Sequence, residues 1–148
     1  MPSPNWLAIF IAALIPMLVG FIYYHKSVFG KPWMSSLGFT DENLKGGNMA
    51  VIFGVSLLMS FLMSMFLLIN VDGPGQEGEF DTFKHGMLHG AMLAIMVGIP
   101  VLVTNGLFER KNFKNLLINA GYWLITFMLM GGVIDALNHW PADMPVVN

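Results

Sequence analysis

Five ionisable side chains lie at one-turn spacing in two stretches of the chain. His85 and His89 are four residues apart, Asp135 and His139 repeat that spacing, and Asp81 precedes His85 by four residues. Residues four apart lie on the same face of a helix. Two such helices side by side supply three imidazoles and a carboxylate, a tetrahedral set that suits Zn²⁺ or another divalent ion. The sequence predicts a divalent-metal site at His85, His89, Asp135 and His139, with zinc as the candidate cofactor, or proton handling by the same residues.

The same side chains have a simpler interpretation as solvated helix ends. His85 and His139 lie about where a membrane interface begins, so contact with water and headgroups is the default for them. Asp135 and His89 lie closer to apolar residues, where an ionisable side chain is costly and tends to have a partner. We therefore expect a contact between Asp135 and His89 that ties their two segments together.

Long apolar segments must position these residues. The chain has 148 residues, of which 55% are apolar and only 11% charged, whereas a soluble surface has about 25–35% charged residues. Helices rise about 1.5 Å per residue, so each uncharged apolar run matches a hydrocarbon core of about 30 Å. The sequence predicts an all-α bundle of four transmembrane helices in two hairpins, within one membrane domain over residues 1–148. Its spans are residues 6–24, 49–69, 85–104 and 116–135.

Local signals refine the spans. Asp81 and Thr82 offer an N-terminal cap before Phe83, which extends the third span backward as helix. Proline is tolerated within a membrane helix and usually produces a kink, as expected at Pro16 and Pro100. The pair 105–106, Asn-Gly, predicts the turn that ends the third span.

Basic residues predict the orientation. Six of the seven Lys and Arg residues lie in residues 25–48 and 104–115, and only Lys84 lies in the connection between the second and third spans. The positive-inside rule places basic loops in the cytoplasm. We therefore expect both termini outside and loops 25–48 and 104–115 cytoplasmic, in a bacterial inner (plasma) membrane.

Aromatic residues near the span ends fit an interfacial belt; they are Trp6, Tyr23, Tyr24, Trp33, Tyr122, Trp123 and Trp140.

Several functional classes are disfavoured. The absence of cysteine excludes disulfides and thiolate chemistry, and a net charge of −2 with scattered basic residues argues against nucleic-acid binding. No phosphate-binding loop, nucleophile elbow or H-E-x-x-H motif occurs. The sequence therefore names no catalytic residue, and whether the protein is an enzyme stays open, with a non-enzymatic role favoured.

Small residues suggest how the helices pack. Stripes at four-residue spacing let backbones approach in lipid; they are Ala8, Ala12, Pro16 and Gly20; Ser56, Ser60 and Ser64; Gly86, Gly90, Ala94 and Gly98; and Gly132 with Ala136. Packing within one bundle explains most of them.

The leading functional prediction is an assembling or accessory membrane component, a homo-oligomer or subunit of a membrane complex in the lipid bilayer. The alternatives are a metalloprotein or redox protein at the His/Asp site, and an oligomeric carrier or channel for a small solute lined by Ser56, Ser60, Ser64 and Asn119.

Four motifs resemble a known family. They are Trp6 at the start of the first span, Gly20-Phe-Ile-Tyr-Tyr24 at its end, Phe29-Gly-Lys-Pro-Trp33, and Asn105-Gly-Leu-Phe-Glu-Arg-Lys111. Over about residues 5–137 the chain resembles the small four-helix bacterial membrane proteins known as a domain of unknown function. The resemblance implies a multi-pass bundle and a bacterial source. It brings no activity and no catalytic residues.

Overall fold

The computed structural model describes residues 4–40, 42, 47–71 and 81–139, and all regular structure in those residues is helical. The elements in chain order are α1 (Trp6–Tyr23), a π-helical turn (Lys26–Gly30), α2 (Lys31–Leu37), α3 (Met49–Val71), α4 (Phe83–Leu93), a second π-helical turn (Ala94–Gly98), α5 (Ile99–Phe108) and α6 (Phe113–Leu137). Four spans are long and apolar enough to cross a membrane: Trp6–Tyr23, Met49–Val71, Phe83–Phe108 and Phe113–Leu137. The predicted four-helix membrane architecture is confirmed, and the chain is a multi-pass membrane protein.

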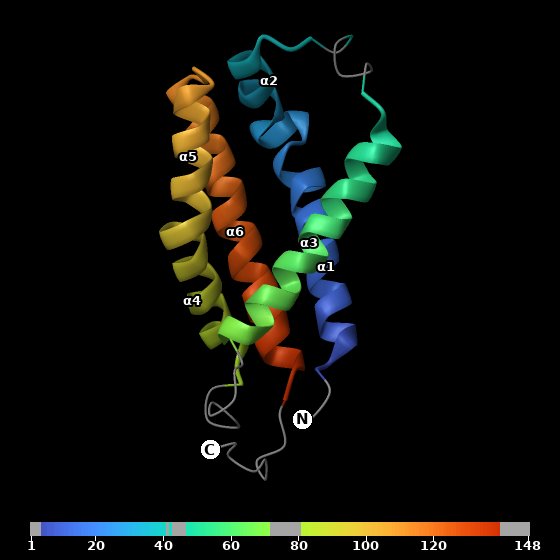
Figure 1. The fold of residues 1–148 in the computed structure, drawn as a ribbon. Helices are drawn as coiled ribbons and strands as arrows, with labels where there is room; N and C mark the ends of the chain where they lie inside the picture. Colours follow the sequence, from blue (N-terminus) through green and yellow to red (C-terminus); the bar gives the residue numbers. More distant parts are fainter. Residues whose placement is uncertain (1–3, 41, 43–46, 72–80, 140–148) are drawn as a thin grey trace.

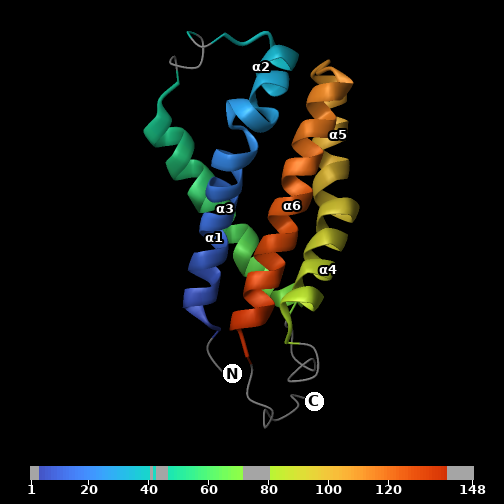
Figure 2. The same ribbon diagram turned by 180° about the vertical axis from the view of Figure 1, so that it is seen from behind.

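The spans run along one another, so the bundle has two distinct ends (Figure 1). One end carries the start of α1 and α4 and the end of α3 and α6, and we call it the histidine end. The other carries the end of α1 and α5 and the start of α3 and α6, and we call it the basic end. The short helix α2 lies at the basic end (Figure 2).

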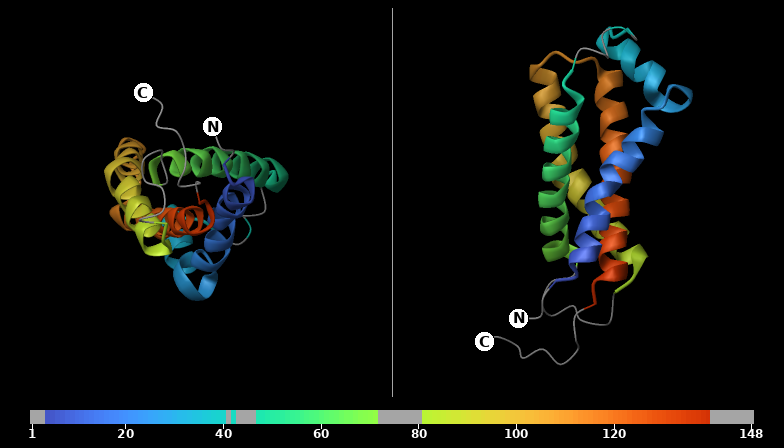
Figure 3. Two further views of the ribbon diagram at one scale, coloured as in Figure 1. Left: turned by 90° about the horizontal axis from the view of Figure 1, so that it is seen from below. Right: turned by 90° about the vertical axis from the view of Figure 1, so that its right-hand side faces the viewer.

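Helix α6 is the centre of the bundle, with α4 and α5 on one side and α1 on the other (Figure 3). Its most extensive contact is with α4, and it also packs against α1 and α3. Apolar side chains of these helices form one core cluster, which consists of Ile9, Ala12, Ile15, Leu67, Leu68, Val71, Ala94, Phe127, Met130 and Ile134.

Glycines bring α4 and α6 into backbone contact. A Cβ added at Gly86 would collide with the carbonyl oxygen of Gly131, and one added at Gly90 with the carbonyl oxygen of Phe127. Close backbone approach through small residues is how helices associate without a hydrophobic driving force in lipid. The predicted glycine stripe of the third span is therefore used inside the protein.

Side-chain caps begin two of the helices, one at the predicted position and one at a position that was not predicted. Thr82 accepts a hydrogen bond from the backbone N–H of His85 at 3.2 Å, so α4 starts at Phe83 as expected. Asn112 accepts a hydrogen bond from the backbone N–H of Asn115 at 2.8 Å at the start of α6.

The predicted turn at residues 105–106 is wrong, because α5 continues to Phe108. The chain turns instead at Arg110, whose φ of 56° is left-handed, and Gly106 gives room to the side chain of Leu116.

The two prolines inside the spans have different effects. Pro16 lies within an uninterrupted α1. Pro100 follows the π-helical turn Ala94–Gly98, which widens the helix just before the ring. Proline cannot donate the i−4 hydrogen bond and its ring crowds the preceding turn, and a π-bulge is one way for a helix to accommodate such a disruption.

Helix α3 is the least enclosed at its start. No residue from Met49 to Met59 is buried, whereas Ser60, Ser64 and Leu67 further along are. The first half of α3 leans away from α6 in both side views (Figures 1 and 2). Apolar exposure of this kind suits lipid or another protein chain and would be costly in water.

Candidate functional site

Asp135 and His85 form the central pair of the histidine end. Asp135 lies in the last turn of α6 and is 1% exposed, while His85 lies in the first turn of α4. The Nδ1 atom of His85 lies 2.9 Å from the Oδ2 atom of Asp135. An ionised carboxylate in apolar surroundings needs a charged or hydrogen-bonding partner, and His85 supplies one.

The predicted partner of Asp135 was His89, and that prediction is wrong. The glycine contact sets the register, because a Cβ on Gly86 would lie 2.6 Å from the Cβ of Asp135, whereas Gly90 faces Phe127 one turn deeper. His85 is therefore level with Asp135. His89 instead packs its ring on His85, with ring centroids 4.4 Å apart and planes inclined by 56°.

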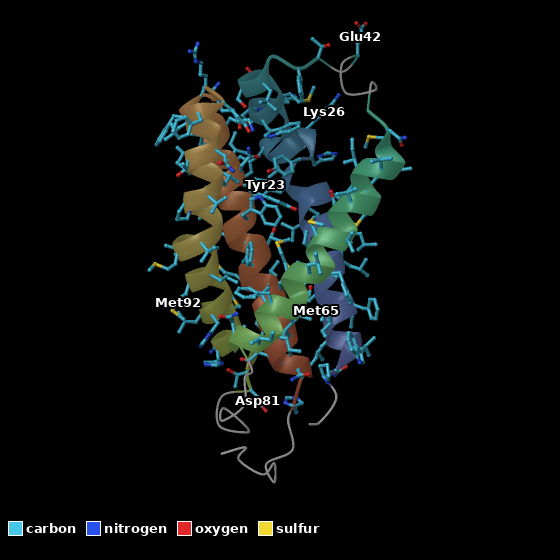
Figure 4. The ribbon with its side chains drawn as sticks, in the orientation of Figure 1. Tyr23, Lys26, Glu42, Met65, Asp81 and Met92 are labelled. Atoms are coloured by element: carbon cyan, nitrogen blue, oxygen red, sulfur yellow. The ribbon has the colours of Figure 1, made fainter. Side chains whose placement is uncertain are left out.

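Asp81 and His139 form a second pair closer to the surface of the same end. The Nδ1 atom of His139 lies 3.1 Å from the Oδ2 atom of Asp81, and the His139 side chain is 59% exposed. Both residues lie just outside their helices, and Asp81 is labelled near the end of the bundle in Figure 4. Of the four predicted ligands, His85 and Asp135 thus form one pair, His139 belongs to the other, and His89 contacts the ring of His85. Within residues 4–40, 42, 47–71 and 81–139, no three His, Asp or Glu side chains gather closely enough to hold a metal ion.

Two asparagines fasten the ends of α1 and α6 beside this site. The backbone N–H of Asn5 donates to Oδ1 of Asn138 at 2.8 Å, and Nδ2 of Asn5 donates to the Leu137 carbonyl at 2.7 Å. Asn138 is 2% exposed. Sequence reasoning did not single out this pair, and its only signal was two asparagines next to predicted helix ends.

A network of neutral polar groups occupies the basic end. The Tyr24 hydroxyl donates to Oδ1 of Asn119 at 2.7 Å, Asn119 donates to Asn115 at 3.0 Å, and Asn115 donates to the Ser36 hydroxyl at 3.0 Å. Burial raises the pKa of Tyr24, with smaller contributions from Tyr122 and Tyr23, so its hydroxyl keeps the proton that it donates. The network joins α1, α2 and α6, whereas the sequence had suggested Asn119 only as a residue lining a solute path.

Aromatic rings pack against one another around this network. The centroid of the Tyr24 ring lies 5.2 Å from that of Trp33 and 5.1 Å from that of Tyr122, and Tyr23 stacks on Phe29 at 4.5 Å. Tyr23 is buried, and Figure 4 shows it among the helices. These rings form a packed cluster, a contact that the prediction of an interfacial belt did not include. Trp6 is 48% exposed, as a belt residue would be, and Trp140 lies outside the described residues.

The serines of α3 bond within their own helix. The Ser60 hydroxyl donates to the Ser56 carbonyl at 2.8 Å, and the Ser64 hydroxyl donates to the Ser60 carbonyl at 2.9 Å. Serine bonding to the i−4 carbonyl is common in membrane helices. These donors are therefore engaged, which gives a polar path along Ser56, Ser60 and Ser64 little support.

Comparison with known proteins adds a family without an activity. A family described as "Protein of unknown function (DUF1761)" matches residues 7–134. No curated protein and no solved structure matches the chain.

Proposed function

The chain belongs to the DUF1761 family of proteins of unknown function, and on that premise we propose that it is a membrane component that responds to protons at its histidine end. The burial of Asp135 supports this most directly. Its carboxylate is 1% exposed inside a membrane-spanning helix and is held by His85 at 2.9 Å. An ionisable side chain in such a place is costly and is typical of a functional site.

Proton-binding groups follow one another from the surface inward. His139 is 59% exposed and pairs with Asp81, His85 is 19% exposed and pairs with Asp135, and the ring of His89 lies one turn deeper on His85. Neighbouring groups of this kind interact electrostatically, because a charge on one favours or disfavours a charge on the next. The arrangement suits the uptake and release of a proton from one side of the membrane.

Protonation at the Asp135–His85 pair acts on the contact between α4 and α6. Asp135 faces Gly86 at the point where the two backbones touch. The pair is strongest when His85 is protonated and Asp135 is not, so either a more acidic or a more alkaline medium weakens the attraction. We propose that the protonation state of the pair adjusts the packing of the first turns of α4 on α6.

Hydrogen exchange tests this proposal. Backbone exchange in the first two turns of α4 is measured from about pH 4 to pH 9, after correction for the intrinsic chemical rate. We expect protection in the wild-type protein to pass through a maximum, Asp135→Asn to remove that dependence, and His25→Gln, at the basic end, to preserve it. Protection that does not change with pH, or a dependence that survives Asp135→Asn, would overturn the proposal.

The predicted metal site uses the same residues, and one further measurement distinguishes a metal site from a proton site. Zn²⁺ is added at constant pH to the wild-type protein and to His89→Gln. A proton site predicts no gain in protection from zinc. A gain in the wild-type protein that His89→Gln abolishes would replace the proton site with a metal site.

Assembly with another chain is the second candidate function, favoured by the first half of α3. No residue from Met49 to Met59 is buried, so this half-helix, which is apolar apart from Ser56, is available to pack on a second copy or a partner subunit. The chain has no cysteine, so single cysteines give clean crosslinks. We expect Val55→Cys to form a disulfide-linked dimer in membranes and Phe21→Cys, on α1, to form none. Equal crosslinking at both positions, or none, would count against assembly through α3.

We place the protein in the inner membrane of a bacterium, with residues 25–48 and 104–115 in the cytoplasm. The asymmetry of the basic residues supports this orientation. A membrane-impermeant thiol reagent applied to intact cells is expected to label Lys84→Cys and to spare Phe39→Cys. The reverse pattern would invert the orientation.

A further inference from the structure

Basic side chains gather at one end of the bundle. Among the described residues the basic end carries Lys26, Lys31, Arg110, Lys111 and Lys114, against the acidic residues Glu42 and Glu109. The histidine end carries a single described lysine, Lys84. Lys26 extends from the bundle at the basic end, on the side of Glu42 (Figure 4). This end therefore presents an excess of positive charge to whatever adjoins it.

Two separate basic segments are held together by hydrogen bonds. The side chain of Asn112 donates to the Ser36 carbonyl at 3.0 Å, and that of Asn115 donates to the Ser36 hydroxyl at 3.0 Å. These bonds fix α2, which begins at Lys31, against the start of α6, which carries Lys114. Two basic segments that are far apart in sequence thus lie against each other at this end, and we call their Lys and Arg side chains together the basic surface.

Exposed apolar side chains accompany the basic surface. Phe108 is 87% exposed and Phe113 is 68% exposed, on either side of Arg110 and Lys111, and Phe29 beside the first loop is 41% exposed. Aromatic rings at this density next to Lys and Arg are typical of the membrane interface, where the rings enter the acyl region and the charges reach the headgroups. In water alone, the exposure of these phenylalanine rings beside the charged side chains would be unfavourable.

Around the loop between α5 and α6, one acidic residue, Glu109, accompanies the basic residues Arg110, Lys111 and Lys114. Lys111 Nζ lies 2.6 Å from Glu109 Oε2, but both side chains are well exposed, so this pair is weak. Arg110, in the left-handed turn between α5 and α6, and Lys114, in the first turn of α6, are both exposed. A guanidinium binds phosphate oxygens through two parallel hydrogen bonds, and a lysine adds a point charge.

We propose that the basic surface binds the headgroups of anionic phospholipids. The positive charge supplies the attraction to the phosphodiester and its net negative headgroup, and the exposed phenylalanines hold the surface at the depth of the headgroups. The ligand is a lipid of the surrounding leaflet rather than a free anion, because the apolar side chains lie on the same surface as the charges.

Lipid competition tests this on the full-length protein in micelles of zwitterionic phosphatidylcholine. Brominated phosphatidylglycerol is titrated in and quenching of tryptophan fluorescence is recorded, with brominated phosphatidylcholine as reference. We expect the anionic lipid to bind about tenfold more tightly, and that preference to fall in raised salt. Equal binding of the two lipids by the wild-type protein would overturn the proposal without any variant.

Charge-neutral variants locate the site. We expect Arg110→Gln/Lys114→Gln and Lys26→Gln/Lys31→Gln each to remove most of the preference, and Lys84→Gln, at the opposite end, to keep it. Circular dichroism checks that each variant retains its helices, and the two double variants test the surface independently. A loss with Lys84→Gln as large as with Arg110→Gln/Lys114→Gln would overturn the proposal. Complete competition by soluble glycerophosphate would do the same, since it would indicate a free-anion site.

Discussion

The two ends of the bundle handle polar groups in opposite ways. At the histidine end, ionisable side chains are paired with one another, and Asp135 is 1% exposed beside His85. At the basic end the charges are at the surface, and the interior positions go to neutral groups such as Asn115, which is 0% exposed. A buried charge depends on its partner, whereas a buried amide depends on several moderate hydrogen bonds. The histidine end should therefore be the more sensitive to single substitutions and to pH.

The largest expected effect comes from leaving the carboxylate of Asp135 alone. His85→Ala should lower the free energy of unfolding by about 3 kcal/mol, because it removes the partner of a buried charge. The double variant His85→Leu/Asp135→Leu should recover part of that loss, since no charge is then left buried. Denaturant unfolding in detergent measures both. A double variant less stable than His85→Ala would mean that packing, not charge, determines the effect.

Breaking the neutral network at the basic end should cost less. Asn115→Leu leaves Asn119 and Ser36 without one partner each, and we expect a loss of about 2 kcal/mol. Denaturant unfolding in detergent, monitored by far-ultraviolet circular dichroism, measures this loss of stability. If Asn115→Leu destabilises the protein more than His85→Ala, the contrast between the two ends is reversed.

Tyr24 gives the basic end a dependence on alkaline pH. Burial raises its pKa, so folding favours the protonated hydroxyl. Its contribution is complete below the ordinary tyrosine pKa of about 10 and is lost as the pH rises toward the raised value in the folded protein. Tyr24→Phe should cost about 1 kcal/mol at neutral pH and make unfolding less sensitive to pH above about 10. An unchanged alkaline profile would assign the dependence to other groups.

The smallest effect is expected at the surface of the basic end. Glu109→Gln removes the partner of Lys111, but both side chains are well exposed, so the loss should be below about 1 kcal/mol. Thermal unfolding at low and high salt measures it. A loss comparable with that of Asn115→Leu would show that this loop is more enclosed than its exposure indicates.

Local patterns predicted the spans well and the contacts between them poorly. The Thr82 cap and the four apolar runs depend only on neighbouring residues, and both are present. The turn at Arg110 was placed too early because Asn105 and Gly106 are common in turns, although here Gly106 makes room for Leu116. The aromatic residues around Tyr24 were predicted to form an interfacial belt, because the position of a residue in a span indicates its depth in the membrane. The contacts between their rings depend on how the helices pack, which position in a span does not indicate.

The amino-acid sequence alone is enough to predict four membrane-spanning helices, with three of the four histidines toward one end and six of the seven Lys and Arg residues toward the other. Hydrophobic length and loop charge are properties of each segment alone. The pairing of Asp135 with His85 and not with His89 becomes visible only in the folded protein. That choice depends on how far α4 is shifted along α6, and the backbone contact of Gly86 and Gly90 with α6 fixes the shift. A displacement of one turn would exchange the two histidines without altering either helix.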